Sequence, residues 1–278
     1  INMTQIKDNQ KDYQDLKKAV DILQSPTITA KIADLIGSPI EKLVNSLPTS
    51  ISKKIGGAVE AALHKSANAA LWSLENKKQD ASPILHKIYA ASSGAIGGAF
   101  GFTALFIELP IATTIMMRSV ADIARSEGFD LTDFSTKQLC IEVFAMGGNT
   151  KSDDATETGY YVTRSFTTGA MQQLSKELAE IAAKQGAQAS AFTTSQAAKW
   201  MAELIEKVAA RFGVVITEKF AAQAVPVIGA VTGAGINTMF IDFYQDMALG
   251  HFTIKRLEQK YGFDHIKKEY NNIVNNRN

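Results

Sequence analysis

Cysteine is nearly absent from this chain of 278 residues, which contains Cys140 alone. A single thiol excludes an internal disulfide framework and a metal site built from several thiolates. An excess of charge is also missing, because 29 lysines and arginines face 28 aspartates and glutamates, for a formal net charge of +1. That balance argues against a basic nucleic-acid-binding protein, so no nucleic-acid partner is expected. With 46% hydrophobic residues, the chain is too apolar to be disordered.

The sequence also lacks targeting and catalytic motifs. No basic stretch followed by an apolar run occurs near its first residues, so no signal peptide is predicted there. The motifs H-E-x-x-H and G-x-S-x-G are absent, and the four histidines are scattered. We therefore expect a cytoplasmic or peripheral-membrane protein, with signal-independent secretion left open. Neither a metal nor an organic redox cofactor is expected.

Proline is scarce and convincing strand patterns are missing, so the chain is predicted to be helical nearly throughout. Three serine–proline pairs are typical of a helix N-cap followed by proline at the first helical position: Ser25-Pro26, Ser38-Pro39 and Ser82-Pro83. Pro110 and Pro226 lie inside apolar stretches and predict breaks or kinks. Residues 225–231 are the best strand candidate, but their helical surroundings outweigh their branched side chains.

These patterns predict an all-α fold, a single-domain helical bundle. Residues 1–80 are expected to form an N-terminal helical extension packed on the main domain, residues 81–278. The polar stretch at residues 147–159 is predicted to be a loop inside that domain rather than a boundary between two domains.

Two segments almost without charge are the most informative feature of the sequence. Residues 88–117 contain one charged side chain, Glu108, and residues 220–241 contain none. Both are rich in alanine and glycine, with glycines four residues apart at Gly94 and Gly98, Gly97 and Gly101, and Gly229 and Gly233. Because that spacing lets helix backbones approach closely, the two segments are predicted to form central, Gly-rich apolar helices that pack together.

Three interpretations of these segments stay open. They bury each other in a helical core, they enclose an apolar cavity for a lipid-type ligand, or they insert into a membrane. Glu108, Pro110 and Asn237 count against ordinary membrane-spanning helices. In the second interpretation, the apolar part of the ligand would lie among six side chains: Phe100, Phe102, Leu105, Ile115, Val227 and Met239.

Ionisable residues flank the first segment. If a helix starts near Pro110, Arg118 and Asp122 share one face and are expected to form an ion pair. Glu108 would join them in a partly buried network if its side chain also faces inward.

Two aspartates follow the second segment. Asp242 and Asp246 are four residues apart, so they repel each other on a helix unless a cation lies nearby. The candidate cations are Arg118, Lys255, Arg256 or a metal ion. His251 would point away from both aspartates on a continuous helix, which makes the three residues a poor metal site.

Three blocks of the sequence together resemble one known family. They are ELPIATTIMMRSVADIARSEG at residues 108–128, CIEVFAMGG at residues 140–148, and residues 213–262, and Tyr160-Tyr161 with Arg164 forms a further element. Their order and spacing are similar to those of the EcsC protein family. The first 80 residues contain no block of this kind. The resemblance implies a mainly bacterial family whose namesake is associated by operon with an ABC transporter, and it carries over no biochemical activity.

The resemblance also directs attention to polar residues inside the matching blocks. Most of them stand beside apolar surroundings, so they are candidates for a ligand-binding site. They are Glu108, Arg118, Glu142, Arg164, Asn237, Asp242, Asp246 and His251.

Our leading hypothesis is a non-enzymatic, membrane-associated or lipid-type ligand-binding protein. A lipid or fatty acid would occupy the apolar cavity, with Arg118 meeting an acidic head group, and a membrane surface or membrane protein is a second expected partner. One alternative is a hydrolase, with or without a metal ion, that uses the region of Glu108, Asp242, Asp246 and His251. Another alternative is a membrane-inserting effector or interaction module.

Overall fold

The computed structural model describes residues 5–37, 40–72, 101–148, 159–165, 194–223 and 229–277. Within these ranges, residues 72, 101–107, 194–197 and 229–235 are described by their backbone alone. The described residues form helices and connecting turns without a strand, which confirms the predicted all-α fold. The α-helices are α1 (Gln10–Leu23), α2 (Ile28–Ile36), α3 (Ile40–Asn45), α4 (Thr49–Ala67), α6 (Gly101–Ser126), α7 (Phe134–Glu142), α9 (Thr194–Gln223), α10 (Gly229–Tyr261) and α11 (Phe263–Asn275), and three short helices of other types are η1 (Ile6–Asp8), η2 (Asn68–Trp72) and η3 (Val143–Ala145).

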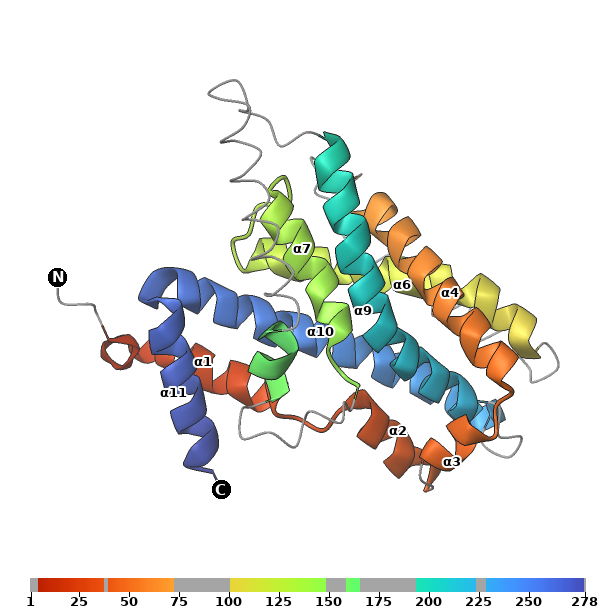
Figure 1. The fold of residues 1–278 in the computed structure, drawn as a ribbon. Helices are drawn as coiled ribbons and strands as arrows, with labels where there is room; N and C mark the ends of the chain where they lie inside the picture. The colour runs from red at the N-terminus through yellow and green to blue at the C-terminus, as the bar shows by residue number, and fades with distance from the viewer. Residues whose placement is uncertain are drawn as a thin grey trace.

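Helix α10 is the longest of these helices, and the others are arranged around it (Figure 1). Its 33 residues span about 50 Å at 1.5 Å per residue. It packs against α1, α6 and α11, while α4 packs against α6 and α9. The N-terminal helices α1 and α4 therefore contact helices of the later part of the chain. The division into an extension and a main domain at residue 80 stays a prediction.

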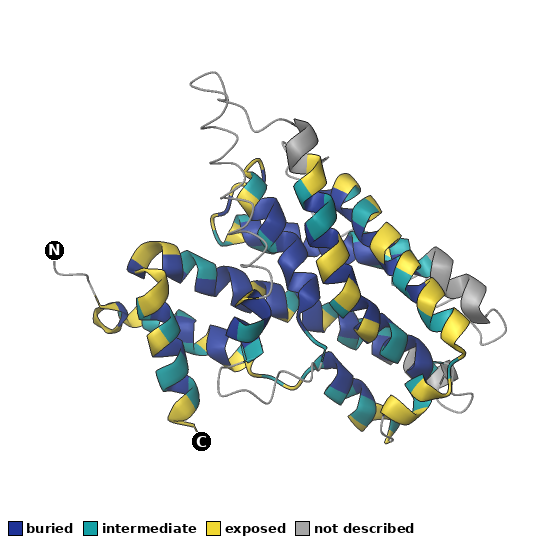
Figure 2. Ribbon diagram, in the orientation of Figure 1, coloured by how far each residue is buried: buried dark blue, intermediate teal, exposed yellow. Residues whose placement is uncertain are grey.

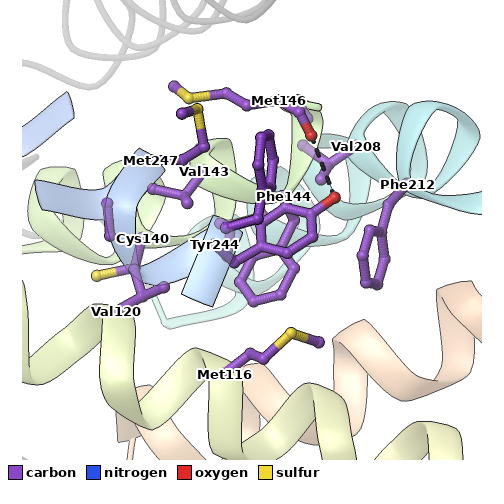
Figure 3. Packing of buried hydrophobic residues seen from close by; sticks show 14 of the residues in the cluster. Met116, Val120, Cys140, Val143, Phe144, Met146, Val208, Phe212, Tyr244 and Met247 are labelled. Carbon is purple, nitrogen blue, oxygen red and sulfur yellow. Dashed lines mark hydrogen bonds between the residues drawn. The ribbon is translucent and has the colours of Figure 1, made fainter. Parts of the chain in front are cut away.

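The core lies where α6, α9 and α10 meet the end of α7 and the short 3-10 helix η3 (Val143–Ala145) (Figure 3). The rings of Phe144 and Tyr244 stack with centroids 5.4 Å apart, and Phe212 meets both edge-on. The Tyr244 hydroxyl donates to the Met146 carbonyl at 3.1 Å, which satisfies a buried polar group. Figure 2 shows the same buried interior flanked by exposed outer helix faces. Cys140 is a core residue here, because it is fully buried, and burial raises the pKa of its thiol.

The two charge-poor segments meet through their described parts, because α6 packs against α10. Two glycines outside these segments allow other close approaches. A β-carbon on Gly250 of α10 would lie 2.8 Å from Leu23 Cγ of α1, and one on Gly147 would lie 2.6 Å from Phe243 Cε1. The glycines of the predicted pairs lie outside the residues whose surroundings the structure describes.

A helix break at Pro110 is wrong, because α6 runs through it from Gly101 to Ser126, while the alternative, a kink, stays a prediction. Proline removes only its own N–H from the helix ladder, and α4 and α10 pack on this helix. The hydroxyls of Thr113 and Thr114 donate to the carbonyls of Leu109 and Pro110, each at 2.7 Å. These are the bonds to the carbonyl four residues earlier that threonine often makes inside helices.

The predicted N-cap at Ser25 is also wrong, by two residues. Helix α2 begins at Ile28, and the Thr27 side chain accepts a hydrogen bond from the Ala30 N–H at 3.2 Å. Threonine is itself a favoured N-cap, so the competing residue was two positions further along. The pairs Ser38-Pro39 and Ser82-Pro83, and also Pro226, lie outside the described residues. Residues 229–231 of the strand candidate are helical, and residues 225–228 lie outside the description.

Candidate functional site

An ion pair between distant parts of the chain forms the centre of the candidate site. Arg164 donates to both carboxylate oxygens of Glu258 on α10, with Nη1 at 2.5 Å from Oε1 and Nη2 at 3.0 Å from Oε2. Both side chains are less than a tenth exposed. Tyr161 donates to the same carboxylate at 3.3 Å, and Lys255 Nζ lies 3.5 Å from Oε2. Such a bidentate pair fixes the helical turn at residues 159–165 against α10.

His251 lies beside this pair and is completely buried. Its Nδ1 is 3.0 Å from the Tyr160 hydroxyl, and its Nε2 is 3.2 Å from Glu142 Oε2 without the alignment of a hydrogen bond. Burial lowers the pKa of His251, although the neighbouring Glu142 carboxylate acts in the opposite direction. The imidazole is therefore neutral near pH 7. Because it is sealed from solvent, it positions its neighbours rather than touching a bound molecule.

Aromatic rings surround the ion pair. Tyr160 and Tyr161 both pack on Tyr270 of α11, with centroids 5.6 and 5.2 Å apart. The Arg164 guanidinium lies 5.5 Å from the Tyr160 centroid and 5.5 Å from that of Phe263. Rings at this distance attract a cation and exclude water from the pair.

A groove of about 760 Å³ opens next to the ion pair, which is within the size range of small-molecule sites. One wall is the turn between α6 and α7 together with α7 itself, and the other comes from α9, α10 and the start of α11. Apolar and charged side chains share its lining. The apolar ones are Phe129, Leu139, Leu204 and Phe263, and the charged ones are Asp130, Asp133, Glu142, Arg164 and Lys255.

Three of the eight predicted site residues therefore come together here. Glu142, Arg164 and His251 belong to three separate segments and meet in one buried cluster. Glu258 was missed, although it follows His251 by seven residues, which is two helical turns on the same face. That spacing is the signal that could have found it.

Two more predicted residues meet at a second place. Glu108 accepts a hydrogen bond from Asn237 Nδ2 at 3.1 Å and lies 3.7 Å from Lys219 Nζ. Lys219 is buried, and desolvation lowers its pKa even though Glu108 favours its charge. The predicted network of Glu108 with Arg118 is therefore wrong, because Lys219 takes the place of the arginine.

The predicted ion pair between Arg118 and Asp122 is also wrong. Asp122 pairs with Arg125, three residues further along α6. The Nε atom of Arg118 is buried without a hydrogen-bond partner. Both arginines were within one helical turn of the aspartate, so spacing alone did not distinguish them.

Asp242 and Asp246 lie at a third place, where both are exposed. Their neighbouring cation is Lys31 of α2, which lowers the pKa of Asp246, whereas burial and Asp242 raise it more strongly. Among the described residues, none of the arginines and lysines expected beside Asp242 and Asp246 pairs with them. Lys255 faces Glu258, and Arg256 faces Asp15 of α1 and Glu127, the residue that follows α6.

The residues of the hydrolase hypothesis are consequently dispersed. Asp242 and His251 are nine residues apart on one continuous helix, about 14 Å along its axis. As expected, they also face opposite ways, because Asp242 is exposed and His251 is buried. Glu108 contacts Asn237, a further five residues toward the start of α10. Among the described residues, no group of three histidine, cysteine or acidic side chains is arranged to hold a metal ion.

The predicted apolar pocket falls mostly outside the description. Phe100 and Val227 are not described, and Phe102 and Leu105 are described by their backbone alone. Ile115 is buried in α6, and Met239 is partly buried beside the core. Within the described segments, no helix has both the length and the hydropathy needed to cross a bilayer.

The fold and the site define an all-α protein in which a buried ion pair lies behind an open groove of mixed polarity. Its family is shown by sequence. The model of the EcsC protein family matches residues 4–257, and the chain therefore belongs to that family. The match includes the first 80 residues, for which no family block was identified in the sequence. No curated protein and no solved structure matches the chain.

Proposed function

We propose that this protein binds an amphipathic, lipid-type ligand in the groove beside Arg164 and does not transform it chemically. The observation that carries the proposal is the composition of the groove, where Phe129, Leu139 and Leu204 share one lining with charged side chains. Amphipathic ligands need both kinds of surface, since their chain gains from leaving water and their head group needs polar partners.

The size of the groove is consistent with such a ligand. Burial of each methylene contributes about 0.8 kcal/mol, so six buried methylenes contribute about 5 kcal/mol before the loss of ligand freedom is counted. The groove of about 760 Å³ has room for a chain of that length together with a head group. Since about 5 kcal/mol corresponds to a dissociation constant of about 0.2 mM, contacts of the head group must add about 3 kcal/mol for the affinity to reach the micromolar range.

The buried contacts of the polar side chains beside the groove support binding without catalysis. His251 is fully buried, and Arg164 is held by Glu258 with both of its terminal nitrogens. Such groups stabilise the wall of the groove. The hydrolase hypothesis loses its support from geometry because its four residues lie at three separate places.

Association with a membrane surface or a membrane protein stays part of the proposal. A ligand of this type would be taken up from, or delivered to, a lipid surface. Co-flotation with liposomes tests this part separately from ligand binding.

The experiment that tests ligand binding combines native mass spectrometry with a groove-filling variant. The gently purified protein is expected to retain an added mass that organic solvent extracts. Gln259 is exposed at the edge of the groove, so Gln259→Trp should fill the site without disturbing the core. Gln14→Trp, at an exposed position of α1, is the matched control. A ligand-free spectrum, together with equal binding of added lipid by both variants, would reject the proposal.

A further inference from the structure

The charges around the groove are unequal. Three acidic residues line it, Asp130, Asp133 and Glu142, against two basic residues, Arg164 and Lys255. The Glu258 carboxylate lies directly behind both basic side chains and adds a fourth negative charge. His251 is buried and neutral near pH 7, so it does not offset this excess.

Two more cations lie close to this region. Lys267 of α11 has its Nζ 5.5 Å from the Tyr161 ring centroid, and Lys137 of α7 stands between Thr136 and Gln138, which line the groove. Counting both with the two basic residues of the lining gives four positive charges against four negative ones. The excess of negative charge is therefore a property of the lining itself, where three carboxylates face two cations that Glu258 already engages.

The two basic residues of the lining are also engaged by the same carboxylate. Arg164 makes its bidentate contact with Glu258 at 2.5 and 3.0 Å, and Lys255 Nζ lies 3.5 Å from that side chain. An anionic head group would have to compete with Glu258 for either cation. Breaking a buried pair of this kind is expensive, because it leaves one charge without its partner.

The acidic residues at the mouth are more accessible. Asp133 precedes α7 and is exposed, and its side chain makes no capping hydrogen bond. Asp130 is exposed as well and accepts hydrogen bonds from the Thr132 N–H and hydroxyl, both at 2.8 Å. A carboxylate retains acceptor capacity after two such bonds.

From this arrangement we infer that the ligand carries a positive charge at its polar end, as an alkylammonium or quaternary ammonium amphiphile does. The inference rests on the proposed function and specifies the class of its ligand. The ammonium group lies near Asp133 and Glu142 at the groove, and the chain packs on Leu139 and Leu204. This reverses the charge of the head group that the sequence suggested for the cavity near Arg118.

The test compares two amphiphiles that differ only in the head group. Decylammonium and decanoate are titrated into the full chain by calorimetry, below their critical micelle concentrations and at low ionic strength. Decylammonium should bind at least about tenfold more tightly, because reversing the ligand charge changes its interaction with every charge of the groove. The ratio should shrink in 0.5 M salt, which screens these interactions.

Two variants locate the effect. Asp133→Asn should weaken decylammonium binding by about two- to threefold while leaving decanoate binding equal or tighter. Asp34→Asn, at an exposed position of α2 outside the groove lining, is the control and should change neither affinity. Neither substitution alters the core, and equal circular dichroism spectra would verify that both variants are folded.

Each outcome decides between the two proposals. Tighter binding of decylammonium that Gln259→Trp and Asp133→Asn weaken supports both. Equal or tighter binding of decanoate overturns the inference about charge but leaves amphipathic ligand binding in place. Failure of both amphiphiles to bind overturns the proposed function itself.

Discussion

Removing the charge of Glu258 should destabilise this protein severely. The substitution Glu258→Gln keeps the shape of the side chain but leaves the Arg164 guanidinium buried, with only 7% of its side chain exposed. Breaking a buried ion pair by removing one partner costs about 3–5 kcal/mol. For a domain of this size, each kcal/mol shifts the melting temperature by about 2–4 °C, so a fall of roughly 6–20 °C is expected.

A double variant separates the loss of the pair from the loss of packing. Arg164→Met combined with Glu258→Leu removes both charges and keeps side chains of similar volume. Replacing both members of a buried pair in this way is often neutral or stabilising, so the double variant should be more stable than Glu258→Gln. Melting curves and urea titrations of the single and double variants measure the difference.

The matched control is an exposed pair on α9. Lys199 and Glu203 lie 4.0 Å apart with side chains 71% and 46% exposed, so Glu203→Gln should change stability by less than about 0.5 kcal/mol. If Glu258→Gln were as mild as this control, or if the double variant were no more stable than Glu258→Gln, the argument that the ion pair holds the wall of the groove would be refuted.

Three further predictions concern other parts of the fold. Gly250→Ala should lower the free energy of unfolding by about 1–3 kcal/mol, because its β-carbon would meet Leu23. The control Gly57→Ala, on an open face of α4, should raise the free energy of unfolding by about 0.5–1 kcal/mol. Urea titration measures both values. The Cys140 thiol should resist a maleimide reagent until the protein unfolds, since it is fully buried, and rapid labelling of the native protein would contradict this packing. Burial lowers the pKa of His251 below its ordinary 6.5, so the unfolded chain binds a proton that the folded chain does not. Stability should therefore fall as the pH drops below about 6.5, by at most about 1.4 kcal/mol per pH unit, and an unchanged slope in His251→Gln would contradict this assignment.

Local patterns in the sequence correctly predicted the structural features that depend only on residues close together in the chain. Helical spacing predicted the all-α fold, and the geometry of a continuous helix predicted that His251 and Asp242 face opposite ways. Both follow from the helical period of 3.6 residues, which is a local property that can be recognised within a single segment.

Partners that are distant in the sequence could not be predicted in this way. Arg164 and Glu258 are 94 residues apart, and they meet only because the turn at residues 159–165 docks on α10. Lys219 became the partner of Glu108 for the same reason, since the packing of α6 and α9 on α4 decides which cation is near. Where two arginines had equivalent spacing from Asp122, the sequence offered no physical basis for choosing Arg125.

The central claim is that an amphipathic cation occupies the groove, and fluorescence quenching tests it most directly. The chain contains two tryptophans, and Trp200 stands four residues before Leu204 on the same face of α9. In a Trp72→Phe background, Trp200 is the one tryptophan left to report. A brominated alkylammonium should quench the emission of Trp200 saturably. The variant that blocks the groove is Gln259→Phe in this experiment, because Gln259→Trp would add a second fluorophore. Saturable quenching that this variant abolishes is the predicted result, whereas quenching that is absent or insensitive to the variant would contradict the account.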